Sequence, residues 1–222
     1  PFAQAATTRF VLIVRGNSLR AMYEDPSGGT TIAAFVFDLG AYDYAGGLVG
    51  LHTAAHQAEF SDLRVAPLSG NGAVRTFCNG GLCDQRTGLC TTTPTLNPTS
   101  RVGDVALPDI CPNPVGGATV SINTLDLSNF EFIDQEPLSE PCAWELAPQG
   151  LRQTSNAWGN YPSDSTVLGC IALIGSESYT DFMVEVTAMH DDDDAWGFVF
   201  GYTKDAIPGH VMAIANNDKW PD

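Results

Sequence analysis

Apolar residues in this chain come in short runs of strand length, divided by glycine, proline and asparagine. Apolar side chains alternate with others at Phe182, Val184 and Val186 and again over 198–202, which places each set on one face of a sheet. No stretch among the first 68 residues keeps an amphipathic helical period over several turns. We therefore predict an all-β protein with packed β-sandwich architecture. The predicted strands cover residues 10–14, 32–37, 48–51, 58–65, 130–133, 143–146, 170–174, 182–186, 196–202 and 211–215.

The charge balance limits the classes of partner. The chain has 222 residues, enough for one large or two small β domains, and its formal net charge is −16, from 10 basic and 26 acidic residues. Such an excess of carboxylates excludes binding along nucleic-acid phosphates and a polybasic contact with a membrane surface. No window approaches the roughly 20 consecutive apolar residues of a membrane span. We expect partners other than nucleic acid and membrane.

The chain divides into three parts with boundaries near residues 68 and 117. Strand patterns fill residues 1–68 and 118–222, whereas Gly, Pro, Thr and Cys dominate residues 69–117, as in a linker or a small stapled module. The threonine- and proline-rich run 91–100 is expected to be extended, either carrying O-linked sugar or serving as a plain stiff spacer. Asn97 is not a usable N-glycosylation site because Pro98 follows it.

Cysteine usage predicts an oxidising, extracellular setting. Four of the six cysteines lie within residues 78–111, a density typical of a disulfide framework. Six cysteines allow 15 pairings, and the sequence does not select one. A zinc site is disfavoured because Cys-x-x-Cys is missing and the four histidines are dispersed. The chain starts without methionine or a basic leader, so we expect a mature chain or an excerpt. The predicted disulfide cysteines are Cys78, Cys83, Cys90, Cys111, Cys142 and Cys170.

Two stretches resemble the C-terminal domain of the thrombospondins, an L-type-lectin-like (concanavalin-like) jelly roll. Residues 192–202, an acidic triplet followed by an aromatic strand ending in Phe-Gly-Tyr, resemble an early part of that domain. Residues 19–24, 44–51 and 60–63 resemble its late strand and closing hairpin. Residues 77–84, with Cys90, are similar to the core of an epidermal-growth-factor-like module. The resemblance implies jelly-roll halves joined by a disulfide-rich segment.

The order of these motifs is inverted, because the end of such a domain lies in residues 1–68 and its beginning in 118–222. Three explanations remain open: an excerpt from a tandem array, a circular permutant, or a protomer whose half-domains are completed by neighbours. Half-sandwiches expose strand edges that invite strand addition, and head-to-tail completion gives rings or filaments. We therefore expect other copies or repeats of this protein as partners.

The run Asp191, Asp192, Asp193 and Asp194 predicts a calcium site. Four adjacent carboxylates repel one another, and a loop folded around a hard cation that takes six to eight oxygen ligands relieves that repulsion. The resemblance implies the same, since the acidic triplet of the thrombospondin domain binds calcium. The alternative is a plain solvated loop. Asp126 and the turn containing Asp218 are candidate partner ligands.

Catalysis is not expected. Jelly-roll glucanases carry three acids on one strand, whereas the nearest pattern here supplies only Asp181 and Glu185, which we predict to be solvent-facing. Aromatic residues offer another function: Trp158 and Tyr161 lie in a predicted loop and are candidate glycan contacts, since exposed aromatic rings stack on sugars. Trp144 and Trp196 are predicted to be core residues.

Two functions follow. The first is a non-enzymatic, calcium-stabilised, disulfide-stapled module of an extracellular structural or adhesive assembly. The alternative is a calcium-dependent carbohydrate-binding domain. Interrupted domain order favours the assembly, whereas exposed aromatic residues beside the acidic loop, or closure of the two halves on each other, favour the lectin.

Overall fold

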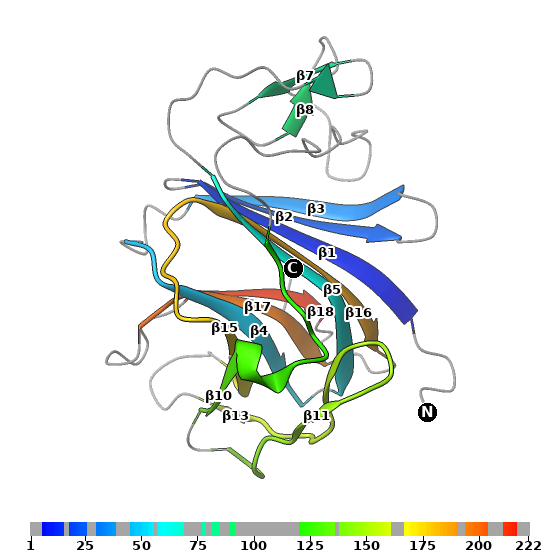
Figure 1. Ribbon diagram of the computed structural model, residues 1–222, viewed down its shortest axis with the longest axis vertical. Helices are drawn as coiled ribbons and strands as arrows, with labels where there is room; N and C mark the ends of the chain where they lie inside the picture. Colours follow the sequence, from blue (N-terminus) through cyan, green and yellow to red (C-terminus); the bar gives the residue numbers. More distant parts are fainter. Residues whose placement is uncertain are drawn as a thin grey trace.

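Two antiparallel β-sheets packed face to face form the body of the protein, shown as a computed structural model in Figure 1. The structure describes residues 6–15, 18–25, 30–38, 45–55, 57–68, 77–78, 81–84, 89–91, 120–135, 138–160, 167–190, 194–203 and 211–216. Within these residues the only helical element is a single 3-10 turn, η2 (Leu127–Asn129). The predictions of an all-β fold and of packed sheets are confirmed.

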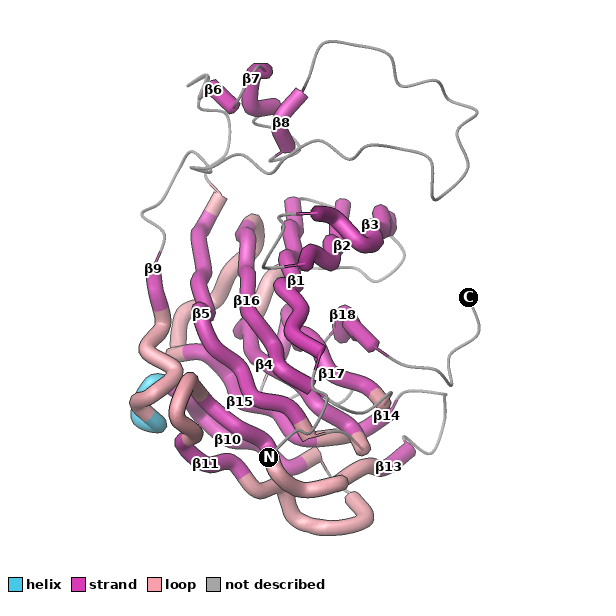
Figure 2. The backbone as a smooth tube through the Cα atoms, turned by 90° about the vertical axis from the view of Figure 1, so that its right-hand side faces the viewer, coloured by secondary structure: helices cyan, strands magenta, loops and turns pink. Residues whose placement is uncertain are grey.

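The large sheet has eight strands and the small sheet five. The order in the large sheet is β11 (Trp144–Leu146), β12 (Leu151–Gln153), β5 (Ala58–Pro67), β16 (Phe182–His190), β1 (Ala6–Arg15), β2 (Ser18–Asp25) and β3 (Thr30–Asp38), and β9 (Val120–Ser121) also pairs with β5. The order in the small sheet is β10 (Phe130–Asp134), β15 (Cys170–Ile174), β4 (Leu48–Ala54), β17 (Ala195–Tyr202) and β18 (Val211–Asn216). Figure 2 shows β5, β16 and β1 side by side, with β4, β15 and β17 behind them.

Five short strands lie outside this body in the part of the chain that the structure describes. A hairpin pairs β13 (Gly159–Asn160) with β14 (Val167–Leu168). The cysteine-rich part contains a three-stranded sheet of β6 (Phe77–Cys78), β7 (Gly81–Asp84) and β8 (Leu89–Thr91). Figures 1 and 2 both draw this small sheet apart from the two packed sheets.

Both sheets contain strands from residues 1–68 and from residues 118–222. In the large sheet β16 lies between β5 and β1, and in the small sheet β4 lies between β15 and β17. Strands of residues 1–68 therefore pair with strands of residues 118–222 within one chain.

Aromatic side chains fill the space between the sheets. Phe10 of β1 stacks on Phe198 of β17 with ring centroids 5.0 Å apart, and Trp196 meets Phe10 edge-on at 5.9 Å. Trp196 is fully buried, as predicted. Trp144 is half-buried and packs against this core at the side of the sandwich, where its ring stacks on Phe132 at 5.7 Å. Burial of these large rings supplies the main stabilisation of the fold.

A disulfide between Cys142 and Cys170 joins the two sheets. Cys170 is the first residue of β15, whereas Cys142 immediately precedes the segment that enters β11. This bond confirms the prediction for two of the six cysteines. Cys78, Cys83 and Cys90 belong to β6–β8, but their side chains, like Cys111 as a whole, lie outside the described residues.

No helix among the residues described is long and apolar enough to cross a membrane.

Candidate ligand-binding end of the sandwich

Strand register brings several loops together at one end of the sandwich. Ala195, at the start of β17, pairs with Ala54, at the end of β4. Trp196 pairs with Asn216, the last residue of β18. His190, the last residue of β16, pairs with Ala58, the first residue of β5. The connection from β16 to β17, the turn from β4 to β5 and the chain after β18 therefore all leave from this end, which we call the acidic end.

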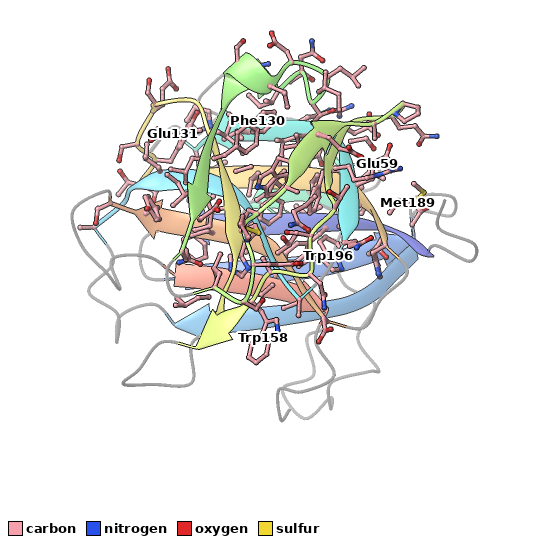
Figure 3. All side chains as sticks on the ribbon, turned by 90° about the horizontal axis from the view of Figure 1, so that it is seen from below. Glu59, Phe130, Glu131, Trp158, Met189 and Trp196 are labelled. Atoms are coloured by element: carbon pink, nitrogen blue, oxygen red, sulfur yellow. A yellow bond between two sulfur atoms is a disulfide. The ribbon has the colours of Figure 1, made fainter. Side chains whose placement is uncertain are left out.

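Trp158 lies at the acidic end with 46% of its surface exposed. Its backbone is held on both sides by one serine: the Trp158 N–H donates to Ser139 Oγ at 3.1 Å, and the Ser139 N–H donates to the Trp158 carbonyl at 2.8 Å. Figure 3 shows the indole pointing away from the body of the protein. The exposed aromatic ring is therefore carried by a backbone that two hydrogen bonds hold in place.

The residues before Trp158 anchor the same segment. Ala157 is buried, and its carbonyl accepts a hydrogen bond of 3.0 Å from the Ala55 N–H in the turn between β4 and β5. The Asn156 N–H donates to a carboxylate oxygen of Glu140. Because Ala55 follows Ala54, the partner of Ala195, this contact links the Trp158 segment to the chain that carries Asp194.

The disulfide between Cys142 and Cys170 also contacts the segment that leads to Trp158. Gln153 is fully buried and donates from Nε2 to Ser155 Oγ and to Cys170 Sγ, the latter at 3.3 Å. The Thr154 N–H donates to the Ala143 carbonyl at 2.9 Å. The segment after Ser139 is therefore joined to the small sheet by the disulfide Cys142–Cys170. The segment before Trp158 is joined to it by the hydrogen bond from Gln153 to Cys170.

Asp194 is the one member of the acidic run that the structure describes, and it lies half-buried directly before β17. Asp191, Asp192, Asp193, Asp218 and Tyr161 lie outside the described residues. Asn216, the last residue of β18, pairs with Trp196, which is two residues after Asp194. The chain that continues to Asp218 therefore starts at the same end of the sheet as Asp194. Among the described residues, no group of three or more His, Cys, Asp or Glu side chains could hold a metal ion.

Asp126 lies elsewhere. It precedes η2, which leads into Phe130 at the far end of β10, and Phe130 pairs with Ile174 rather than with Cys170. Ile174 and Cys170 are four residues apart on β15, which corresponds to about 13 Å along the strand. Calcium ligands lie about 2.4 Å from the ion, so one ion cannot bind both Asp126 and Asp194. The expectation that Asp126 completes the acidic-loop site does not fit this geometry.

The Asp126 carboxylate instead caps η2. Its Oδ1 accepts hydrogen bonds from the Ser128 hydroxyl at 2.7 Å and from the Ser128 N–H at 3.0 Å. These two hydrogen bonds hold the pKa of Asp126 below its ordinary value, and the bond from the Ser128 hydroxyl has the larger effect. Asn123 closes the same turn by accepting from the Leu125 N–H at 3.1 Å.

Of the two acids considered for catalysis, Glu185 is placed differently from the prediction. Glu185 is not solvent-facing: it is 7% exposed and pairs with Arg9 and, at 3.2 Å, with Arg64 on the outer face of the large sheet. Asp181 precedes β16 and accepts a backbone hydrogen bond from Leu68 at 2.8 Å. Glu185 is buried because arginines from the two neighbouring strands neutralise its charge. The alternation of residues within β16 alone does not indicate these partners.

Sequence reasoning missed two groups. Ser139 and Glu140 hold the Trp158 segment across a gap of about 16 to 19 positions, and no local motif marks them. Glu59 is a buried carboxylate bound by Arg152 at 2.6 Å and by the Gln149 N–H at 3.1 Å. Its position beside Phe60 in an apolar strand gave no sign of an ion pair.

A scan against protein-family models gives no match for this chain, and searches among curated proteins and among solved structures give none either.

Proposed function

We propose that this chain is an extracellular, non-enzymatic carbohydrate-binding module built as a lectin-like jelly roll, with Trp158 as the surface on which a sugar ring stacks. The observation that carries the proposal is the exposed indole at the acidic end, on a backbone that Ser139 holds by two hydrogen bonds. The pyranose ring presents a flat apolar C–H face, and an aromatic ring is its natural counterpart. Because the backbone that carries the ring is already held, that backbone loses little conformational freedom on binding.

The proposal includes calcium at the acidic end. Oxygen ligands would come from Asp191, Asp192, Asp193 and Asp194, supplemented by the turn that follows Asn216. In this arrangement the ion binds the acidic run, and the indole supplies the apolar contact. The two contributions are separable by experiment.

The test is retardation of the protein in gels that contain soluble polysaccharide. We expect wild-type protein to be retarded and the Trp158→Ala variant to migrate as in plain gel. Leu125→Ala is the matched control, because Leu125 is similarly exposed, at 49%, and lies away from the acidic end. Equal retardation of all three proteins, or of none, would refute carbohydrate binding through Trp158.

A second candidate is assembly of copies into a filament or matrix, and one surface favours it. Edge strand β10 of the small sheet lies beside β11 of the large sheet, bridged by the stack of Phe132 on Trp144. Four exposed apolar side chains belong to this flank or to the turn leading into it: Leu125, Leu127, Phe132 and Leu146. Apolar surface next to a strand edge favours association of chains.

Sedimentation at increasing protein concentration tests the assembly. We expect wild-type protein to associate and Leu146→Lys to remain monomeric, because a charge on this exposed position opposes burial of the flank. Trp158→Ala should associate like wild type. A monomer at all concentrations would argue against an assembly through this surface.

A further inference from the structure

The disulfide between Cys142 and Cys170 has one accessible side and one buried side. Cys170 is fully buried in β15, whereas Cys142 is partly exposed and lies between the exposed residues Pro141 and Ala143. A thiolate opens a disulfide by attacking one of its two sulfurs, and access decides which of them is attacked. An external thiol can therefore reach this bond at Cys142, with Cys170 as the sulfur that leaves.

The sulfur of Cys170 faces hydrogen-bond donors. The Gln153 amide donates from Nε2 to Cys170 Sγ at 3.3 Å, and the Ser155 hydroxyl lies 3.9 Å from the same sulfur. Ser155 Oγ also accepts a hydrogen bond from Gln153 Nε2, so its own hydrogen can be donated to the sulfur. A disulfide sulfur is a weak acceptor, whereas a thiolate carries a negative charge and accepts strongly. These donors therefore stabilise Cys170 more as a thiolate than as part of the disulfide.

Gln153 is poorly satisfied while the disulfide is closed. Its side chain is fully buried, and its Oε1 has no hydrogen-bond partner among the residues that the structure describes. Its Nε2 directs one of its two hydrogens at a weak acceptor, the sulfur of Cys170. A buried amide in this state costs free energy. Release of a thiolate at Cys170 reduces that cost, because it gives the amide a charged acceptor.

We propose that the Cys142–Cys170 bond is a thiol-exchange site that takes small thiols in their thiolate form. The incoming sulfur forms a bond with Cys142 Sγ, the bond between Cys142 and Cys170 breaks, and its electron pair leaves on Cys170 Sγ. The incoming thiol is oxidised to a mixed disulfide on Cys142. Cys170 is reduced to a thiolate, which Gln153 and Ser155 stabilise. This exchange does not depend on the proposed binding of carbohydrate.

Exchange changes what holds the segment around Cys142. The Ala143 carbonyl accepts from the Thr154 N–H, and Ser139 is hydrogen-bonded to Trp158, so this segment stays attached to the chain that follows β12. It loses its covalent link to β15 in the small sheet. The exchange therefore removes a connection between the two sheets and leaves the hydrogen bonds beside β11 and β12 in place.

Glutathione is the probe for this exchange. The complete folded chain is incubated with excess glutathione, quenched with acid at early times, alkylated in denaturant and mapped by peptide mass spectrometry, which reports each cysteine separately. Circular dichroism verifies that the chain is folded during the incubation. We expect glutathione on the peptide that carries Cys142 and an alkylated Cys170. First attachment of glutathione to Cys170, or a bond that stays closed in the folded protein, would overturn the proposal.

Ser155→Ala and Gln153→Met distinguish stabilisation of the leaving sulfur from a structural role. Each variant removes a donor to Cys170, so we expect the bond to open about five-fold more slowly. A variant that only weakened the fold would open faster, because unfolding exposes the bond. Ser155→Ala alone is sufficient for the test if Gln153→Met does not fold. Opening of the folded variants as fast as wild type, or faster, would overturn the role of these donors.

Thr154→Ala is the matched control. The Thr154 hydroxyl donates to the Ala143 carbonyl at 3.3 Å, so this variant removes a neighbouring hydroxyl without removing a donor to sulfur. We expect the Thr154→Ala variant to open at the wild-type rate. Slowing by the same factor as in Ser155→Ala would contradict the assignment of the effect to hydrogen bonds at Cys170.

Discussion

Gly150 shows how a single position can depend on having no side chain. A Cβ at this residue would lie 1.8 Å from the carbonyl oxygen of Phe60, a backbone atom of β5 that cannot move aside cheaply. We predict that Gly150→Ala lowers the free energy of unfolding by about 2–3 kcal/mol, the range for overpacking a core. Urea unfolding measures this directly.

Gly175→Ala is the control for that variant. Its Cβ would meet open space, and only its φ of +57° disfavours alanine. The left-handed backbone costs about 1 kcal/mol for a residue with a Cβ. A loss at Gly150 no larger than the loss at Gly175 would contradict the close approach of the two chains.

Asp126 predicts an acid-dependent contribution to stability. Since its hydrogen bonds from Ser128 lower its pKa in the folded state, the stabilisation is present above the ordinary value of 3.8 and is lost as pH falls through the lowered value. NMR titration of the carboxyl carbons should find this shift, and Ser128→Ala should return the pKa toward 3.8 because it removes the hydroxyl donor. An identical pKa in both proteins would disprove the contribution of the Ser128 hydroxyl to this cap.

At the scale of elements, the outer face of β16 depends on one buried carboxylate held between strands. Glu185 accepts from Arg9 of β1 and Arg64 of β5, so it connects three adjacent strands of the large sheet. We predict that Glu185→Ala destabilises the protein by about 2 kcal/mol, because it leaves two arginines without their shared partner. Thermal or urea unfolding provides the measurement.

Glu145→Ala is the matched comparison. Glu145 is more than half exposed and reaches Arg152 only at 3.9 Å, an interaction that solvent screens. It should change stability by less than about 0.5 kcal/mol. Similar losses for the two variants would mean that Glu185 contributes no more than an ordinary surface pair.

The predictable elements were those whose own residues carry the pattern. Alternation or apolar runs identified the strands that became β1, β4, β5, β15, β16 and β17, because each of these packs one face on the core. Strand β12 was missed, since three residues are too few to show a period. The contact of Ser139 with Trp158 was missed for a different reason: it joins segments 19 residues apart through one serine hydroxyl and two backbone groups, and no sequence pattern marks such a contact.

At the scale of the whole molecule, the arrangement of strands could not be derived from the sequence. Motif order indicated two half-domains but not their partners, and only the register of β16 with β5 and β1, and of β4 with β15 and β17, brings residues 1–68 and 118–222 into the same sheets. That register decides which loops share an end. It places Trp158 and Asp194 at one end of the sandwich and Asp126 toward the other end.

The proposed calcium ion at the acidic end predicts that the stability of the protein depends on calcium. If the ion is present at 100 times its dissociation constant, it adds about 2.7 kcal/mol, so excess chelator should lower the melting temperature by several degrees. Without the ion, the adjacent carboxylates of residues 191–194 repel one another and favour opening of the loop between β16 and β17. Scanning calorimetry with and without chelator measures the difference.

Two variants make the calcium prediction specific. Asp192→Asn combined with Asp193→Asn should abolish the effect of the chelator, because the amides weaken the site and relieve the repulsion together. Asp126→Asn should keep the full effect, since the capping turn at η2 lies about 13 Å or more away along the small sheet. An equal melting temperature with and without chelator would leave the acidic run as a solvated loop, and a loss of the effect in Asp126→Asn would place the ion at the other end of the sandwich.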